Sequence, residues 1–233
     1  MTNLAFKLAV DPVANPFLLT VFGETAANDS DTTRKTHNMA AGSDEGVAAA
    51  RSLGDLSHAV YNRVQPAGDG NNLLFIDYWN SIEGLMQFFS NPDVQKGGDL
   101  VFKRRDPIVW RPSPGLPNFN LPAPYGRNER FVGLVHGPVK SYTAAEALVT
   151  ELLRKAANRH RANGLITREW YFRLNPPGTP EALEAIGVDV WFDKAGMEAT
   201  YADPTELAGF GDLFTARPST STWQKPAGQW VEW

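Results

Sequence analysis

The chain has 233 residues, contains no cysteine, and carries 22 Lys and Arg residues against 26 Asp and Glu residues. The missing cysteines exclude disulfides, thiolate catalysis and thiolate metal ligands, and the mildly acidic balance provides no basic surface for nucleic acid or an anionic membrane. No apolar run approaches the length of a membrane span, so we expect a soluble, cytoplasmic protein.

Strands and helices alternate along the first half of the sequence. Apolar, β-branched segments predict strands at Phe17–Glu24, Leu56–Gln65 and Leu73–Trp79, with the turn sequence AGDGNN between the last two. Gly42 and Ser43 interrupt the helical sequence after the first strand, which predicts helices over 31–41 and 44–53. A further helix is expected from Ser81 to Asn91–Pro92, where it ends because the residue before a proline leaves the α region. A strand is expected next, near Ile108–Trp110.

The second half repeats this order. A strand is expected at Phe131–Gly137, followed by one long helix that Ser141 caps and Asn163–Gly164 ends. Two more strands follow, and Asp193 then opens a helix that Asp203–Pro204 stops or kinks. The last strand is expected near Thr220–Trp223.

An internal duplication explains the repeated order. Residues 77–105 align without a gap on residues 189–217, at an offset of 189 − 77 = 112. Composition alone would give about two matches, whereas seven positions are identical: Asp77/Asp189, Trp79/Trp191, Gly84/Gly196, Pro92/Pro204, Gly97/Gly209, Phe102/Phe214 and Arg105/Arg217.

The alignment continues upstream with small changes of offset. Residues 56–66 match 166–176, and residues 17–23 match 131–137. The sequence therefore predicts two fold units, over residues 1–113 and 129–233. Residues 114–128 form a proline-rich linker, which we expect to be an extended, semi-rigid connector.

Each repeat has the β-α-β-β-α-β order of the ferredoxin-like unit, which places both helices on one face of a four-stranded sheet. The predicted strands are apolar on both faces, since Ile76 and Tyr78 alternate with Phe75 and Trp79. A bare apolar sheet face needs a partner. The sequence therefore predicts an α+β protein in which the two sheets pack face to face as a barrel within one chain.

A D-x-W strand, a Ser- or Asp-capped helix, an aromatic residue at Phe89/Tyr201 and an Asn- or Asp-Pro pair occur in both repeats. This pattern resembles the dimeric α+β barrel superfamily, and within it the antibiotic-biosynthesis-monooxygenase-like domains. The resemblance implies the fold, homodimers among many members, and a substrate between the sheet and the helices. The activities that it implies include cofactor-free oxygenation of polyketide-type phenols, polyketide cyclisation and haem degradation.

The resemblance does not extend to haem ligands. Relatives that degrade haem use a Trp and a His on the second helix, and the aligned positions here are Phe88 and Gly98 in repeat 1, and Thr200 and Phe210 in repeat 2. The four histidines also lack the spacing of a metal motif. We therefore expect no metal and no cofactor. The alternative is that His37, His58 or His136 binds haem in a different way.

Repeat 1 carries the candidate catalytic residues. His37 and Asn38 lie on the interrupted helix and His58 lies on the second strand, so two imidazoles and an amide could deprotonate a phenol and hold the oxyanion. The alternative is that His37 is a surface residue, Asn38 a helix-end cap and His58 a strand histidine that the backbone satisfies.

The expected pocket lies between the sheet and helices of repeat 1, where Tyr61, Asn62 and Trp79 are the candidate substrate-binding residues. Repeat 2 has Arg168 at the position of His58, so we expect it to act as a scaffold that closes the barrel. An Arg–Asp pair, Arg63 with Asp77, is also expected across neighbouring strands of repeat 1.

The leading hypothesis is a cofactor-independent, monooxygenase- or cyclase-like enzyme that acts on a small, apolar, aromatic or polyketide-like substrate. The alternative is a non-enzymatic module that binds a small ligand or a partner and has a vestigial pocket. The expected partner is a small molecule, and the free helices and edges leave room for a homodimer.

Overall fold

The computed structural model describes residues 16–66, 72–176 and 178–233, and the predicted AGDGNN turn therefore lies almost entirely outside the described residues. Repeat 1 contains β1 (Phe17–Thr25), α1 (Ser30–Ala40), α2 (Asp44–Ser52), β2 (Asp55–Gln65), β3 (Leu73–Trp79), α3 (Ile82–Phe89), α4 (Pro92–Val101) and β4 (Phe102–Arg111). After β5 (Phe119–Asn120), repeat 2 contains β6 (Phe131–Pro138), α5 (Tyr142–Ala162), β7 (Leu165–Arg173), β8 (Glu184–Trp191), α6 (Lys194–Ala202), α7 (Pro204–Gly211) and β9 (Ser219–Gln224).

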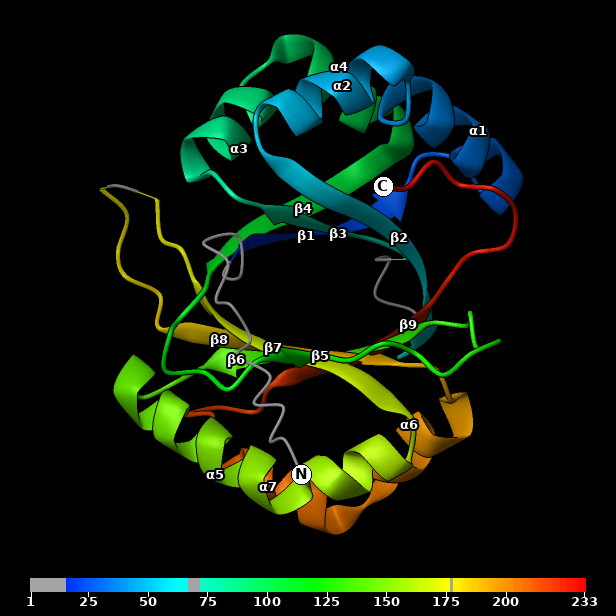
Figure 1. Ribbon diagram of the computed structural model, residues 1–233. Helices are drawn as coiled ribbons and strands as arrows, with labels where there is room; N and C mark the ends of the chain where they lie inside the picture. Colours follow the sequence, from blue (N-terminus) through cyan, green and yellow to red (C-terminus); the bar gives the residue numbers. More distant parts are fainter. Residues whose placement is uncertain (1–15, 67–71, 177) are drawn as a thin grey trace, which may run out of the picture.

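The strands form one antiparallel sheet that closes on itself (Figure 1). Repeat 1 contributes the order β4-β1-β3-β2 and repeat 2 contributes β9-β6-β8-β7, which is the same ferredoxin-like order twice. The pairings β2–β9 and β4–β7 join the two repeats. The predicted barrel within a single chain is confirmed.

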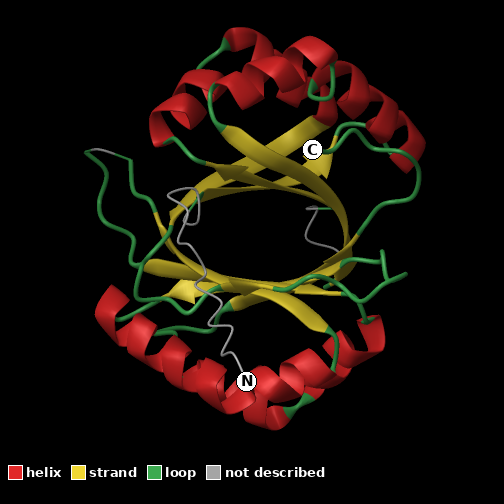
Figure 2. Cartoon of the chain, viewed as in Figure 1, coloured by secondary structure: helices red, strands yellow, loops and turns green. Residues whose placement is uncertain are grey.

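Side chains sort to the two faces of the sheet as the alternation predicts. The barrel interior is one cluster with members from both repeats, among them Ile76, Trp110, Val188 and Trp223. The outer faces carry separate clusters under the helices of each repeat. Figure 2 shows the helices as two outer layers with the strands between them, so each repeat has its own space between sheet and helices.

Capping residues explain the helix limits. Ser81 accepts a hydrogen bond from the Gly84 backbone N–H at the start of α3. The predicted stop before Pro92 is confirmed, but a new helix, α4, begins there because Asn91 caps it and proline suits its first turn. Among the described helices, none combines the length and apolar character that a membrane crossing requires.

Each repeat sends a segment onto the second strand of the other repeat. The segment after β4 includes β5, which lies within the predicted linker and pairs with β7 at Phe119–Arg168. The segment after β9 reaches β2, where His58 and Trp233 exchange backbone hydrogen bonds. In Figure 1 this last segment runs from β9 across to the helices of repeat 1. The extended connector predicted for 114–128 is therefore also part of the sheet.

Candidate functional site

The three predicted catalytic residues of repeat 1 lie together. His37 Nε2 is 3.0 Å from His58 Nε2, and His37 Nδ1 is 3.0 Å from Asn38 Oδ1. His58 Nδ1 lies 2.6 Å from Oδ1 of Asp77, the residue that was expected to pair with Arg63. His37 is fully buried and His58 is 5 % exposed, so neither is a surface residue.

The hydrogen bonds of Asn38 fix where the protons lie in this chain of groups. Its Oδ1 accepts from the Val231 N–H and its Nδ2 donates to the Gln229 carbonyl. His37 must then donate from Nδ1 to Asn38 and accept at Nε2 from His58. The remaining proton lies between His58 Nδ1 and Asp77, and burial, with the neighbouring His58, lowers the pKa of His37 to about 4.

Residues 225–233 cover this histidine pair. The Trp233 ring stacks on His58 with centroids 4.7 Å apart, and the Trp230 ring lies 5.2 Å from His37. Phe75 contacts both imidazoles from the sheet. Asn38 therefore holds the covering segment and does not cap its helix, which ends at Ala40 with Ala41 as the C-cap.

The predicted substrate-binding residues of repeat 1 do not line one space. Trp79 is fully buried against Phe88 and Phe89. Tyr61 belongs to the cluster inside the barrel, whereas Asn62 is the next residue of β2 and so lies on the opposite face. Aromatic side chains thus fill the neighbourhood of Trp79.

The expected Arg63–Asp77 pair does not form. Asp77 contacts His58 directly across β2 and β3, and the Arg63 guanidinium lies over the Trp223 ring inside the barrel. The prediction was wrong because the two side chains lie on opposite faces of the sheet. In repeat 2 the aligned Asp189 pairs with Arg168, which aligns with His58.

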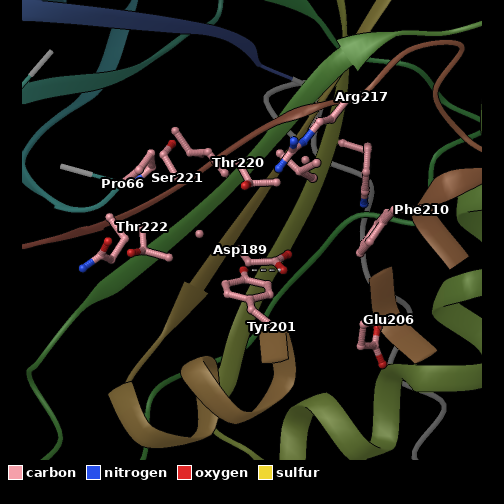
Figure 3. A pocket seen from close by; sticks show the side chains of 15 residues that line it. Pro66, Asp189, Tyr201, Glu206, Phe210, Arg217, Thr220, Ser221 and Thr222 are labelled. Atoms are coloured by element: carbon pink, nitrogen blue, oxygen red, sulfur yellow. Dashed lines mark hydrogen bonds between the residues drawn. The ribbon is translucent and has the colours of Figure 1, made fainter. Parts of the chain in front are cut away.

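A cavity of about 390 Å³ lies in repeat 2, between the sheet and helices α6 and α7 (Figure 3). The pocket was expected in repeat 1, whereas this cavity lies in the opposite repeat. Its apolar lining comes from Leu134, Val135, Trp170 and Phe210. Its polar lining includes Asp189, Tyr201, Glu206, Arg217 and three consecutive residues of β9, Thr220, Ser221 and Thr222.

An ion pair and a tyrosine form the polar floor of the cavity. Arg168 donates to both oxygens of Asp189, at 2.7 and 2.5 Å. The Tyr201 hydroxyl donates to Asp189 Oδ2 at 3.0 Å and accepts from the Trp191 indole N–H at 3.2 Å. Burial, together with the negative charge of Asp189, raises the pKa of Tyr201 well above its ordinary value, so the hydroxyl keeps its proton at neutral pH.

Glu206 also lines the cavity, and two basic residues of α5 contact its carboxylate. Arg159 and His160 contact the same carboxylate oxygen of Glu206. Arg168 donates from Nη1 to His160 Nδ1 at 2.7 Å, so that nitrogen is an acceptor and the imidazole is neutral. Burial and the neighbouring Arg168 lower the pKa of His160 to about 4.

Small residues in the sheet of repeat 2 compensate for large side chains in the space between its sheet and helices. Gly133 aligns with Leu19, and a Cβ on Gly133 would lie 1.9 Å from the Tyr201 hydroxyl oxygen. Gly187 aligns with Phe75, and a Cβ there would lie 2.8 Å from the Trp170 ring. Two glycines in the sheet therefore make room for two large side chains that line the cavity.

The lining residues of the cavity do not suit haem. Repeat 2 has no histidine facing the cavity, because His160 is held between Arg168 and Glu206 and His136 packs beside Phe22 and Trp110. In the described part of the chain, no cluster of His, Asp and Glu has the arrangement of a metal site. We therefore derive no step through iron or another metal.

Solved structures of the same architecture match nearly the whole chain. An anthrone oxidase-like protein matches with a TM-score of 0.60 at 15 % identity, covering 93 % of each chain. A candidate monooxygenase from Lactobacillus acidophilus NCFM matches with a TM-score of 0.58 at 10 % identity, covering 90 % of this chain and 93 % of its own. Chlorite dismutase from Candidatus Nitrospira defluvii in complex with imidazole matches with a TM-score of 0.54 at 13 % identity, covering 91 % of each chain.

These matches and the ring-closed sheet show that the chain has the dimeric α+β barrel fold, with both halves in one polypeptide. No protein-family model matches the sequence, and neither does any curated protein. At these identities the likeness establishes the fold, and the same fold carries many chemistries.

The cavity was not predicted from the sequence, although the sequence contains two signals for it. The alignment shows glycine at the positions of Leu19 and Phe75, which indicates a different interior in repeat 2. It also shows that Asp77 and Asp189 keep a polar partner on the next strand, His58 or Arg168. The volume of the cavity could not be predicted, because it depends on which neighbouring side chains fill the space that a glycine leaves.

Proposed function

We propose that the protein is a cofactor-independent, monooxygenase-like enzyme that acts on a small, largely apolar aromatic substrate in the repeat 2 cavity. The observation that carries the proposal is an apolar cavity with one tyrosine–carboxylate pair at its floor. Pockets for small ligands combine apolar walls with a few such polar groups. Trp170 and Phe210 provide aromatic walls for a planar ring.

Tyr201 and Asp189 supply a path for a proton. The Tyr201 oxygen can receive a proton from the substrate while its own proton passes to Asp189 over the 3.0 Å contact. The Trp191 N–H stabilises negative charge on the same oxygen. Removing a proton from an electron-rich aromatic substrate gives the anion that reacts with O₂, so the protein's task is to bind the ring and accept the proton.

Anthrone is the first substrate to test, because one similar structure is described as anthrone oxidase-like. We expect the protein to accelerate oxidation of anthrone or of a related hydroxylated ring, followed by absorbance under air. Tyr201→Phe keeps the ring and removes the hydroxyl, so turnover should fall by about 10²-fold or more. Substrate affinity should change by much less. Unchanged turnover in Tyr201→Phe would remove this assignment.

The histidine pair of repeat 1 is the alternative catalytic site. The buried chain Asn38–His37–His58–Asp77 is built to hold and move one proton. A substrate would have to displace Trp230 and Trp233 to reach it. Loss of turnover in His58→Ala with normal turnover in Tyr201→Phe would assign the reaction to repeat 1, and the reverse result would assign it to repeat 2.

A non-enzymatic ligand-binding module is the rival function, and the aromatic filling around His37 and His58 favours it for repeat 1. The cavity in repeat 2 favours ligand binding under either function. If aromatic probes bind saturably and none of them is turned over under air, the protein is a ligand-binding module and not an enzyme.

A further inference from the structure

Arg217 lies at the cavity, and no described residue compensates its charge. Figure 3 shows its side chain beside Thr220, on the opposite side of the cavity from Glu206. Arg217 makes no hydrogen bond or ion pair with any residue in the ranges that the structure describes. The other two charged lining residues are paired, Asp189 with Arg168 and Glu206 with Arg159. Among the residues that the structure describes, the cavity therefore carries one positive charge without a partner.

The aligned arginine of repeat 1 is fully engaged. Arg105 Nη2 lies 2.9 Å from Asp99 Oδ1, and it donates to the side-chain and backbone oxygens of Gln95 at 2.7 and 3.1 Å. Its guanidinium rests directly on α4 at Gly98, where a Cβ would lie 1.7 Å from Arg105 Nη1. The absence of a side chain at Gly98 permits this close approach.

Two substitutions remove this arrangement from repeat 2. Gly211 aligns with Asp99, so the carboxylate that pairs with Arg105 has no counterpart. Phe210 aligns with Gly98 and places a ring where the guanidinium would rest on the helix. Phe210 lies against Trp170 and lines the cavity instead. One of the two changes that release Arg217 from α7, Phe210 at the position of Gly98, thus also builds one wall of the cavity.

Two hydroxyl groups accompany the free arginine. Thr220 and Thr222 alternate with Ser221 and Trp223 along β9, so their side chains share the outer face of the sheet, toward the cavity. Neither hydroxyl bonds to another group in the described ranges, whereas Ser221 accepts from the Trp223 indole. Arginine with neighbouring hydroxyls is a donor set that suits a carboxylate.

We propose that Arg217, assisted by Thr220 and Thr222, binds a carboxylate on the substrate, which makes the substrate an aromatic carboxylate. This inference rests on the proposed function, because it concerns the same cavity. The aromatic ring lies against the wall that Trp170 and Phe210 form, and the carboxylate lies at the Arg217 end. The anion then supplies the negative charge that Asp99 supplies to Arg105 in repeat 1.

A matched pair of probes tests the proposal, 2-naphthoate and its neutral analogue 2-naphthamide, each titrated calorimetrically into the full chain. The native protein should bind 2-naphthoate about tenfold more tightly or better, since hydrogen bonds to charged groups are among the strong ones. Arg217→Gln should abolish this preference by weakening 2-naphthoate alone, and Arg217→Lys should retain part of it. Arg105→Gln, the matched control in repeat 1, should leave both affinities unchanged.

Two results would overturn the proposal, and they are distinguishable. Equal affinities for the two probes, unchanged in Arg217→Gln, would reject the carboxylate assignment and leave the aromatic cavity standing. Failure of the native protein to bind either probe would reject the cavity as an aromatic site, and the proposed function with it. Arg217 is exposed, so the melting temperature of Arg217→Gln should equal that of the native protein. A melting curve checks this.

Discussion

The two repeats share one architecture, yet apolar side chains pack together between sheet and helices in repeat 1, whereas the corresponding space of repeat 2 holds a cavity. Leu19 and Phe75 are buried in the outer cluster of repeat 1, and the aligned residues of repeat 2 are Gly133 and Gly187. After a duplication, the strand order and the barrel interior constrain both copies. The helix–sheet space is under no shared constraint, so one copy can become a packed core while the other binds a ligand.

The polar groups under the helices diverged in the same way. Asp77 faces a histidine and Asp189 faces an arginine, at the same place in the sheet. A histidine can become neutral when its carboxylate is lost, whereas an arginine stays charged. Replacing each of the two aspartates should therefore lower the free energy of unfolding by a different amount.

The largest expected effect separates these two aspartates. Asp189→Asn leaves Arg168 buried, charged and without its ion pair, which should lower the free energy of unfolding by about 3 to 5 kcal/mol. Asp77→Asn should cost only about 1 to 3 kcal/mol, because His58 can rearrange its proton. Urea unfolding of both variants measures the difference. Equal losses would mean that the two sites are electrostatically alike.

The covering segment provides the next test. Trp233→Ala removes the ring stacked on His58, and we expect a loss of about 1 to 3 kcal/mol, below the value for a fully buried tryptophan because Trp233 is only partly buried. The NMR signal of the His58 ring should shift at the same time. Phe119→Ala, in the segment that pairs with β7, is the control and should leave that signal in place. A variant as stable as the native protein would show that residues 225–233 are not part of the repeat 1 core.

Both repeats bury a neutral histidine, so stability should fall in acid. The pKa values of His37 and His160 are lowered from 6.5 to about 4. Unfolding then releases a histidine that takes up a proton, and stability is lost as the pH falls from about 6.5 toward 4, at up to about 1.4 kcal/mol per pH unit for each residue. Melting temperatures of His37→Gln and His160→Gln between pH 4 and 8 should each show a shallower acid slope. Slopes identical to the native slope would count against neutral, buried imidazoles.

A buried acid gives repeat 1 an opposite pH dependence of its own. Burial, and then the charge of Asp77, raises the pKa of Asp55 from 3.8 to about 8, and the aligned residue in repeat 2 is Leu165. The folded protein holds this proton more tightly than the unfolded chain does, so stability should decrease as the pH rises from about 4 toward 8. Asp55→Asn should remove that decrease. The same melting series measures it, and an unchanged slope between pH 6 and 8 would contradict the raised pKa.

The smallest expected effect compares the two aligned arginines. Arg105→Gln breaks a partly exposed ion pair with Asp99 and should cost at most about 1 kcal/mol. Arg217→Gln breaks no such pair and should leave the free energy of unfolding unchanged within error. A larger loss for Arg217→Gln than for Arg105→Gln would show that Arg217 is held by the fold, contrary to its proposed role.

The sequence predicts the architecture well because the duplication and the strand alternation both have long-range consequences. Alternating apolar residues such as Ile76 and Trp79 require a second sheet, and the repeat supplies it. The grouping of His37, Asn38 and His58 also followed from their places on neighbouring elements.

The side chains that occupy the space between sheet and helices in each repeat could not be predicted from these sequence patterns. The cavity depends on how Tyr201 and Trp170 share the room left by Gly133 and Gly187, which is a matter of side-chain volume in three dimensions. The cover over His58 depends on backbone hydrogen bonds between Trp233 and His58, in a segment where no periodic pattern predicts a strand. The only hint was the pair of tryptophans, Trp230 and Trp233, in the last four residues.

One titration tests most directly whether the ligand space lies in repeat 2 and is closed in repeat 1. ¹⁵N-labelled protein is titrated with 2-naphthol, and the backbone amide signals are followed by NMR. Our account predicts saturable shifts at Gly133, Gly187 and Ser221, with His58 and Val60 unmoved. Shifts at His58 and Val60, with those three signals still, would place the ligand under residues 225–233 and contradict the account.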